Sequence, residues 1–327
     1  MSATAWQVDS PGGNFRPVEI TPTPLAPNHV RVRIAAAGVN PLDTKIRAGK
    51  AAHAKHPLPA ILGLDMAGIV EETGPAVTAF KPGEEVYGMV GGVGGLQGTL
   101  AQFINVDADL LAHKPRSLSM REAAALPLVA ITAWEGLVDH AKVSEGKTVL
   151  IHAGAGGIGH IAIQIARANE ATVFATVSAE KKHIVEALGA TPIDYRAVTV
   201  EEYLAEHTHG EGFDIIFDTV GGATLDASFL AAKRYTGHVV SALGWGTHAL
   251  APLSFRAASY SGIFTLLPLL TGQGRAHLAW ILFRIAALAD SGKLRPILSD
   301  RRFTPADLEA AYTQVESGSL GKVVIDM

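Results

Sequence analysis

Three glycines in the middle of the chain have the spacing of a phosphate-binding turn. Gly154, Gly156 and Gly159 satisfy the pattern G-x-G-x-x-G, between the apolar run VLIHA and the helical-looking run IAIQIARA. In such a turn the first glycine permits a tight bend, the second lets the backbone approach a pyrophosphate, and the third lets helix and strand pack closely. A bare strand–helix turn is the alternative. The strand before and the helix after favour a dinucleotide cradle, in which free N–H groups of the helix N-terminus bind the phosphates.

The residues after the next predicted strand indicate which dinucleotide binds. An NAD site places a carboxylate about 20 residues after the first glycine, but the window around Thr176 contains none. Ser178 can instead hydrogen-bond a 2′-phosphate, and Lys181 or Lys182 can pair with its charge. These lysines could be a solvated helical turn, but cations at a helix N-terminus oppose the dipole unless an anion lies nearby. The pattern therefore predicts NADPH.

The composition excludes several classes of function. The 327-residue chain has no cysteine, which excludes disulfides, zinc–thiolate sites, iron–sulfur clusters and thiol nucleophiles. A net charge of −4 gives no general attraction to nucleic acid or to an anionic membrane. No apolar stretch reaches the roughly 20 residues of a membrane span, and the N-terminus lacks a signal-peptide pattern. We therefore expect a cytoplasmic protein that binds a small molecule.

The pattern of elements changes near residue 120. Before it, valine-, glycine- and proline-rich segments with strand-like alternation indicate a mostly β region. Ser119 and Glu122 have the spacing of a capping box at the start of a helix. Beyond them short apolar strands alternate with helices, which indicates a parallel sheet covered on both faces. A later helix has one apolar stripe, with Trp280 and Phe283 on another face. The stripe consists of Leu278, Ile281, Leu282, Ile285 and Leu288.

With these motifs the chain resembles the zinc-independent quinone oxidoreductases, the zeta-crystallin-like members of the medium-chain dehydrogenase/reductase superfamily. The segments that carry the resemblance are AAAGVNPLDTKIRAG, LPAILGLDMAGIVEETG, FKPGEEVYG, AAALPLVAITAWEGL, HAGAGGIGHIAIQIA, FDTVGG and GKVVIDM. The resemblance implies an α/β fold with a GroES-like, β-rich substrate domain at 1–120 and 265–327. It implies a Rossmann domain, a doubly wound parallel sheet, at 121–264. It also implies a homodimer.

The resemblance further implies a site without metal. Zinc-using relatives have a cysteine where GVNPLD has Asn40, and His-Glu where GLDMAG has Leu64 and Asp65. A reductase without a Lewis acid needs an acceptor that takes hydride readily, such as a quinone or an activated carbon–carbon double bond. A simple ketone would need polarisation by a metal. We therefore expect an NADPH-dependent oxidoreductase that reduces a quinone. An enone or enoyl reductase is the alternative, and an NADPH-binding protein with little catalysis is the alternative of another class.

Several site residues follow from the turn and the resemblance. Asn40 would donate its amide N–H to the substrate oxygen, and water or Tyr87 would supply the proton. Asp43 would act at the site or be structural, orienting its loop or pairing with Arg47 four residues on. Lys322 is implied as a cofactor contact. The predicted cofactor-binding residues are Thr132, Gly154, Ala155, Gly156, Gly157, Ile158, Thr176, Ser178, Lys181, Tyr195, Val220, Leu243, Gly244 and Lys322.

Overall fold

The computed structural model describes residues 2–318 and 320–327 and divides into two compact units. One unit comprises Met1–Leu128 and Leu266–Met327, and the other comprises Val129–Thr265. The first boundary between these units lies after residue 128. The reason is helix α2 (Met120–Ala124), which packs on strands of the first unit. A Cβ atom added to Gly38 of strand β3 (His29–Val39) would lie 2.3 Å from the carbonyl oxygen of Ala124, so helix and strand backbones touch.

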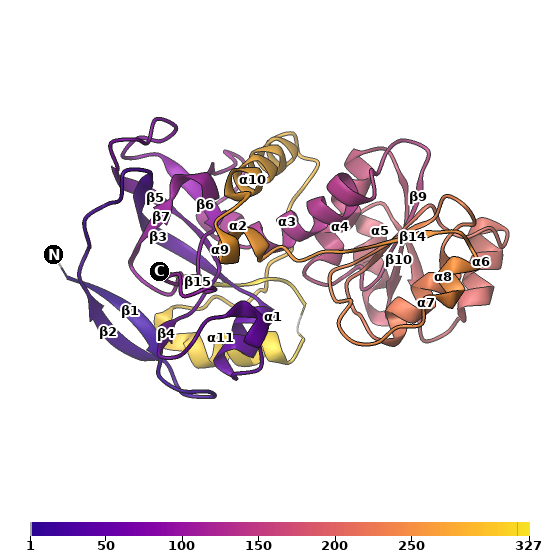
Figure 1. The fold of residues 1–327 in the computed structure, drawn as a ribbon, viewed down its shortest axis with the longest axis horizontal. Coiled ribbons are helices and arrows are strands. Elements are labelled where there is room, and N and C mark those ends of the chain that lie inside the picture. Colours follow the sequence, from indigo (N-terminus) through magenta and orange to yellow (C-terminus); the bar gives the residue numbers. More distant parts are fainter. Residues whose placement is uncertain (1, 319) are drawn as a thin grey trace. The chain divides into compact units, whose positions relative to one another are not determined.

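The first unit contains two antiparallel sheets (Figure 1). One has the strand order β2-β1-β4 and the other the order β15-β3-β5-β6-β8, with β7 paired to β3. The strands are β1 (Ala3–Val8), β2 (Arg16–Ile20), β3 (His29–Val39), β4 (Ala60–Ile61), β5 (Asp65–Thr73), β6 (Glu85–Met89), β7 (Phe103–Asp107), β8 (Ala112–His113) and β15 (Val323–Asp326). This β-rich unit agrees with the predicted GroES-like domain.

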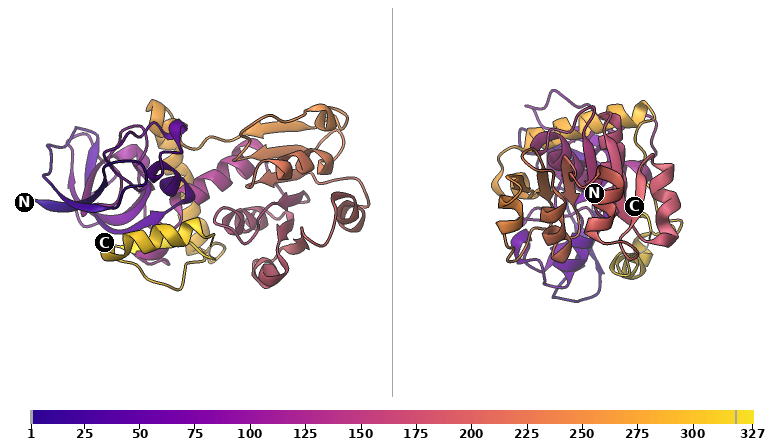
Figure 2. Two further views of the ribbon diagram at one scale, coloured as in Figure 1. Left: turned by 90° about the horizontal axis from the view of Figure 1, so that it is seen from below. Right: turned by 90° about the vertical axis from the view of Figure 1, so that its right-hand side faces the viewer.

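The C-terminal part of the chain completes this sheet unit. Strand β15 pairs antiparallel with the end of β3, and α11 packs on both strands and on α1. Figure 2 shows this yellow helix beside the indigo strands of the same unit. On α10 the predicted apolar stripe is buried from Leu278 to Ile285, while Trp280 and Phe283 are exposed. The helices are α1 (Pro41–Arg47), α9 (Leu267–Thr271), α10 (Arg275–Asp290) and α11 (Leu308–Glu316).

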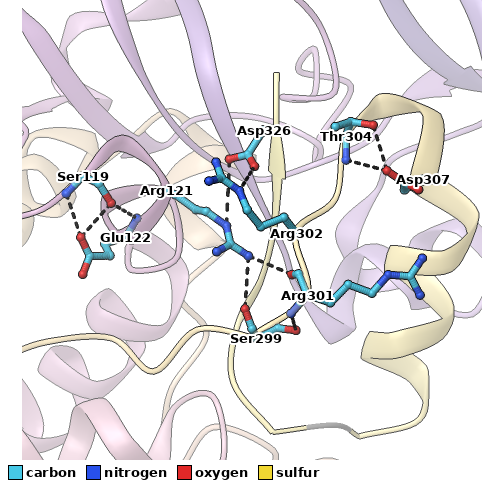
Figure 3. A network of polar contacts seen from close by, with 9 residues as sticks. All are labelled: Ser119, Arg121, Glu122, Ser299, Arg301, Arg302, Thr304, Asp307 and Asp326. Carbon is cyan, nitrogen blue, oxygen red and sulfur yellow. Dashed lines mark hydrogen bonds and ion pairs between the residues drawn. The ribbon is translucent and has the colours of Figure 1, made fainter.

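Polar contacts fix α2 to this C-terminal segment (Figure 3). The predicted capping box is confirmed: the Ser119 N–H donates to the Glu122 carboxylate at 2.9 Å, and the Glu122 N–H donates to Ser119 Oγ at 3.3 Å. Arg121 then donates to the backbone carbonyls of Ser299, at 3.2 Å, and Arg301, at 2.9 Å. The capped helix is thus held against residues that lie far from it in the sequence.

The second unit is one parallel sheet in the order β11-β10-β9-β12-β13-β14. Read along the chain this is the order 3-2-1-4-5-6 of a doubly wound fold, so the predicted Rossmann domain is confirmed. The order reverses between β9 and β12, where such sheets bind their ligands. The strands are β9 (Thr148–Ile151), β10 (Thr172–Val177), β11 (Thr191–Asp194), β12 (Ile215–Asp218), β13 (His238–Ser241) and β14 (Ser259–Gly262).

Helices connect these parallel strands (Figure 1). The apolar run that leads into the unit divides at Pro127, whose missing N–H cannot continue α2. Its continuation is α3 (Pro127–Trp134) and a π-helical segment, Glu135–His140. The remaining helices are α4 (Gly159–Ala168), α5 (Lys182–Ala187), α6 (Val200–Thr208), α7 (Ala223–Ala231) and α8 (Ala251–Ser254). Over the described residues of both units, every helix is too short or too polar to span a membrane.

Candidate active site

The glycine turn lies at the carboxyl end of β9, beside the reversal of strand order. A Cβ atom on Gly154 would lie 2.6 Å from the Cβ of Ala175, and one on Gly159 would lie 2.2 Å from the carbonyl oxygen of Ala153. These two glycines therefore allow strand, turn and helix to pack closely. A Cβ on Gly156 would meet only Ala153, whose carbonyl oxygen is 3.0 Å away. Apart from Ala153 and the chain neighbours of Gly156, no atom of the described residues lies within 4 Å of this Cβ position, so the space that a ligand would need is open there.

Backbone N–H groups of this turn are available to an anion. The Gly156 N–H closes the turn by donating to the Ala153 carbonyl at 2.8 Å. Within the described parts of the chain, the N–H groups of Ala155, Gly157 and Ile158 donate to no protein acceptor. They precede the first residue of α4, where the helix dipole favours negative charge. The turn thus fits the pyrophosphate of a dinucleotide.

Thr176 supports the glycine turn through two hydrogen bonds. Its side chain is buried, and its Oγ1 accepts the Ala153 N–H at 3.1 Å. Its carbonyl accepts the Gly154 N–H at 2.9 Å. The predicted cofactor contact of Thr176 stays a prediction.

Polar side chains gather where β10 and β11 end, at the predicted 2′-phosphate position. Ser178 begins the 3-10 turn Ala179–Lys181, and Tyr195 directly follows β11, which is paired in parallel with β10. Arg196, which the sequence analysis overlooked, lies with its guanidinium 5.5 Å from the Tyr195 ring centroid and 3.6 Å from the Glu180 carboxylate. A hydrogen bond from Ser178 and the charge of Arg196 lower the pKa of Glu180. The structure therefore places a second cation near Lys181.

The turns after β12 and β13 are joined through Asp218, which the sequence analysis also overlooked. The Asp218 carboxylate is buried and accepts the Val220 N–H at 3.0 Å and the Ser241 hydroxyl at 2.6 Å. Ser241 Oγ in turn accepts the Leu243 N–H at 3.1 Å. Val220 and the residue after Leu243, Gly244, are both exposed. The Asp218 carboxylate thus positions the backbone of Val220 directly and that of Leu243 through Ser241. Val220 and Leu243 are both predicted cofactor contacts.

Thr132 lies inside the second unit. Its side chain is buried and its Oγ1 is 3.2 Å from Oγ1 of Thr265, which donates to the Glu135 carboxylate at 2.6 Å. These contacts join α3 and the π-helical segment to Thr265, the last residue of the second unit. The predicted nicotinamide contact of Thr132 stays a prediction.

Four buried polar residues of the first unit form a compact group, the Asn40 cluster: Asn40, Asp43, Asp65 and Lys322. The sheet register brings them together, because Val323 is opposite Val39 and Asp65 is opposite Gly38 on adjacent strands. The Asn40 side-chain amide donates to Asp65 at 2.9 Å and accepts from the Lys322 ammonium. The backbone N–H of Asn40 donates to Asp43 at 2.8 Å.

The Asn40 cluster holds two carboxyl groups against one ammonium. Burial raises the pKa of Asp43 to about 7 and that of Asp65 to about 6, although hydrogen bonds from Asn40 and the charge of Lys322 act in the opposite direction. Burial lowers the pKa of Lys322, and the two aspartates oppose this shift. Of the alternatives for Asp43, the structure supports loop orientation. Arg47 pairs with Glu309 instead.

Three predicted site residues therefore have other partners. Asn40 has both polar side-chain atoms engaged within the cluster, where no part of the residue is exposed. Lys322 donates to Asn40, and its predicted cofactor contact stays a prediction. Tyr87 is buried, and its hydroxyl donates its proton to the Leu282 carbonyl at 2.6 Å. This environment argues against Tyr87 as the proton donor, because its only proton is already engaged.

Comparison with known proteins agrees with both units. Residues 26–116 match the family model of the alcohol dehydrogenase GroES-like domain, and residues 157–268 match that of zinc-binding dehydrogenases. The chain is 33% identical over 360 residues to the mitochondrial NAD(P)H oxidoreductase RTN4IP1 of Bos taurus, which covers 99% of this chain and 89% of that protein. The chain belongs to the medium-chain dehydrogenase/reductase superfamily.

Solved structures of this superfamily have the same fold. An alcohol dehydrogenase superfamily protein from Novosphingobium aromaticivorans is 54% identical, with a TM-score of 0.97 and 99% coverage of both chains. The quinone oxidoreductase from Coxiella burnetii is 28% identical, with a TM-score of 0.83 and 100% coverage of both chains. The bovine relative is mitochondrial by name, and the cytoplasmic location and the homodimer stay predictions for this superfamily member.

The zinc of one matched family model raises the question of a metal in this chain. Across residues 2–318 and 320–327, no group of three or more histidine or acidic residues could hold a metal ion. At the positions where the resemblance places zinc ligands, Leu64 is buried and apolar, and Asn40 and Asp65 are engaged with Lys322 and each other.

Proposed function

We propose that this chain is an NADPH-dependent oxidoreductase that reduces a quinone without a metal. Bound NADPH supplies the hydride, and the quinone takes up this hydride and one proton from solvent to become a hydroquinone. The bovine relative is named an NAD(P)H oxidoreductase and the Coxiella structure is that of a quinone oxidoreductase. The residues of this chain contribute binding and orientation of the two reactants.

The observation that carries this proposal is the ammonium of Lys322 in the Asn40 cluster. A metal ion there would meet a positive charge hydrogen-bonded to Asn40, and Leu64 offers it no ligand atom. Two cations at such short range in a buried site repel each other strongly. Quinones suit a site of this kind, since they accept hydride without a Lewis acid.

The cofactor assignment follows from the donors of the second unit. The amides of Ala155, Gly157 and Ile158 supply hydrogen bonds for the pyrophosphate. Lys181 supplies positive charge after β10, where an NAD-specific site would carry a carboxylate, and Arg196 supplies it after the neighbouring strand β11. A 2′-phosphate would compete with Glu180 for Arg196, exchanging a carboxylate partner for a more highly charged one.

The direct test is oxidation of NADPH in the presence of a panel of acceptors. We expect turnover of ortho- and para-quinones, no turnover of simple ketones, and the same rates after dialysis against a chelator. Reduction of enones alone would identify an enone reductase. Reduction of simple ketones alone, or loss of activity with the chelator, would contradict the metal-free assignment. Tight NADPH binding without reduction of any acceptor would identify a binding protein.

Lys181→Ala tests the cofactor preference. We expect about tenfold weaker NADPH binding, the ordinary contribution of one charge-assisted hydrogen bond, and nearly unchanged NADH binding. Lys147→Ala is the matched control, because Lys147 precedes β9 at the amino end of the sheet. Dissociation constants from titration of protein fluorescence provide the measurement. Equal weakening for both cofactors would show that Lys181 does not recognise the 2′-phosphate.

A further inference from the structure

His152 lies between β9 and the glycine turn, and the proposed reaction makes no use of it. Its side chain is buried, and its backbone is held on both sides. The His152 N–H donates to the Phe217 carbonyl at 3.0 Å, and its carbonyl accepts the Thr219 hydroxyl at 2.7 Å. The backbone of His152 is therefore fixed in position. Its two ring nitrogens lie near residues of two different elements, β10 and α7.

The hydrogen bonds of the ring define its tautomer. Ser228 Oγ lies 3.1 Å from Nε2 of His152, but its only proton is donated to the Thr224 carbonyl at 2.8 Å. Ser228 must therefore accept a proton from Nε2. In a neutral imidazole Nδ1 is then a bare acceptor. It lies 3.1 Å from Thr176 Oγ1. In this tautomer the Thr176 hydroxyl is the donor to Nδ1.

The electrostatic environment keeps the ring neutral. Burial lowers the pKa of His152 to about 4, and the nearby charge of Asp218 opposes this shift without overcoming it. At neutral pH the Nδ1 atom therefore stays an acceptor. Thr176 Oγ1 in turn has its lone pairs available for the Ala153 N–H, which it accepts at 3.1 Å.

The end of this hydrogen-bonded chain is a strained residue. Ala153 has a φ of 54°, in the left-handed region that residues with a Cβ rarely adopt. Such a conformation persists only where its surroundings enforce it. The Ala153 carbonyl also accepts the Gly156 N–H that closes the glycine turn, at 2.8 Å. The geometry of the turn thus depends on how firmly Ala153 is held.

We propose that His152 is a positioning residue of the cofactor site, which acts through Thr176 to hold Ala153 in its left-handed conformation and so keeps the phosphate-binding turn in shape. This inference rests on the proposed function, because it assigns the turn to NADPH. This role requires that Nδ1 accept a hydrogen bond from Thr176. The hydrogen bond that Nε2 donates to Ser228 selects the tautomer in which Nδ1 is an acceptor.

Two amide substitutions separate the ring nitrogens. In His152→Asn the amide oxygen can take the position of Nδ1 and accept from Thr176. In His152→Gln the longer side chain reaches Ser228 and leaves Thr176 without an acceptor. We expect His152→Gln to weaken NADPH binding about tenfold, as for one lost buried hydrogen bond. His152→Asn should bind NADPH with an affinity within about threefold of the wild-type value. This is expected even though asparagine leaves a larger cavity than glutamine does.

A second variant tests the strain directly. Glycine adopts positive φ without cost, so Ala153→Gly in the His152→Gln background should restore most of the lost NADPH affinity. Nitrogen NMR of labelled histidine should show His152 neutral, with the proton on Nε2, between about pH 5 and pH 8. Thermal unfolding checks that each variant is folded.

The outcomes separate this inference from the proposed function. If the wild-type protein does not bind NADPH, the proposed function fails, and a proton on Nδ1 in the NMR spectrum would overturn the hydrogen-bond chain independently. His152 has only a packing role if NADPH binds but His152→Asn and His152→Gln lose the same NADPH affinity. The same conclusion follows if Ala153→Gly restores no affinity in the His152→Gln background.

Discussion

Replacing Lys322 with methionine should destabilise the fold by about 3–5 kcal/mol at about pH 8, the usual cost of leaving buried charge without a counter-charge. The ammonium is the only cation of the Asn40 cluster, and Asp43 and Asp65 are both buried beside it. Without it, each carboxyl group must ionise in an apolar interior or take up a proton. Urea unfolding of the variant and the wild type measures the difference.

The pH dependence of this loss follows from the pKa values. Asp43 and Asp65 have folded-state pKa values of about 7 and 6, above the ordinary value of 3.8. Groups with raised pKa values favour the folded state at low pH, and this contribution is lost as the pH rises through 6 and 7. Removing the ammonium raises both pKa values further. The destabilisation should therefore be smaller at about pH 5, where protons neutralise the carboxylates.

Two further variants make the result interpretable. Lys293→Met replaces an exposed lysine of the same unit and should change stability by less than about 0.5 kcal/mol. Lys322→Met combined with Asp65→Asn removes one charge of each sign and should recover part of the stability. A Lys322→Met protein as stable as Lys293→Met at every pH would show that the ammonium does not stabilise the cluster.

Gly156→Ala should abolish most NADPH binding while the protein stays folded. The new methyl group would lie 3.0 Å from the Ala153 carbonyl, a tight but tolerable contact, and would project into the space above the turn. Because it would separate the pyrophosphate from several amide donors at once, we expect about a hundredfold weaker binding, equivalent to two charge-assisted hydrogen bonds. Calorimetric titration with NADPH measures the dissociation constant, and thermal unfolding of the free protein measures the melting temperature.

Gly159→Ala is the informative comparison for this variant. Its methyl group would lie 2.2 Å from the Ala153 carbonyl oxygen, so backbone atoms would have to move. We expect Gly159→Ala to lower the melting temperature, which Gly156→Ala should leave nearly unchanged. Wild-type NADPH affinity in Gly156→Ala would place the pyrophosphate away from this turn.

The sequence identified those features whose signals are local. A strand, a glycine turn and a helix are consecutive in the chain, and their periodicities and glycine spacing are visible in a short window. The same holds for the capping box at Ser119. The window around Thr176, which contains no carboxylate, and Lys181 are also close together in the sequence. Both could therefore be used to predict the cofactor.

Contacts between distant residues account for most of what the sequence did not reveal. Lys322 is 282 positions from Asn40, and only the pairing of β15 with β3 makes them neighbours. The Tyr87 hydroxyl bonds to a carbonyl 195 positions away. The resemblance and the side-chain types gave Asn40 and Tyr87 the roles of donors, because both side chains can donate. Which acceptor takes their protons is decided by tertiary packing.

Arg196 and Asp218 were overlooked for a different reason. Asp218 is the last residue of β12, and Arg196 follows β11 after Tyr195. Both therefore lie at the edge of the parallel sheet where ligands bind. A charged residue at the carboxyl end of a predicted strand was an available signal. Asp218 in FDTVGG and Arg196 in IDYR both carry it.

The pairing of β15 with β3 also has a consequence for the order in which the protein assembles. The second unit is one continuous segment, so all of its strands are present once residue 265 has been synthesised. The first unit has its early strands exposed on the ribosome long before their partner emerges. Asn40, Asp43 and Asp65 acquire their only ammonium when residue 322 arrives. Because domains fold as units, the unit that is synthesised first cannot complete its sheet until β15 has been synthesised, after every strand of the second unit.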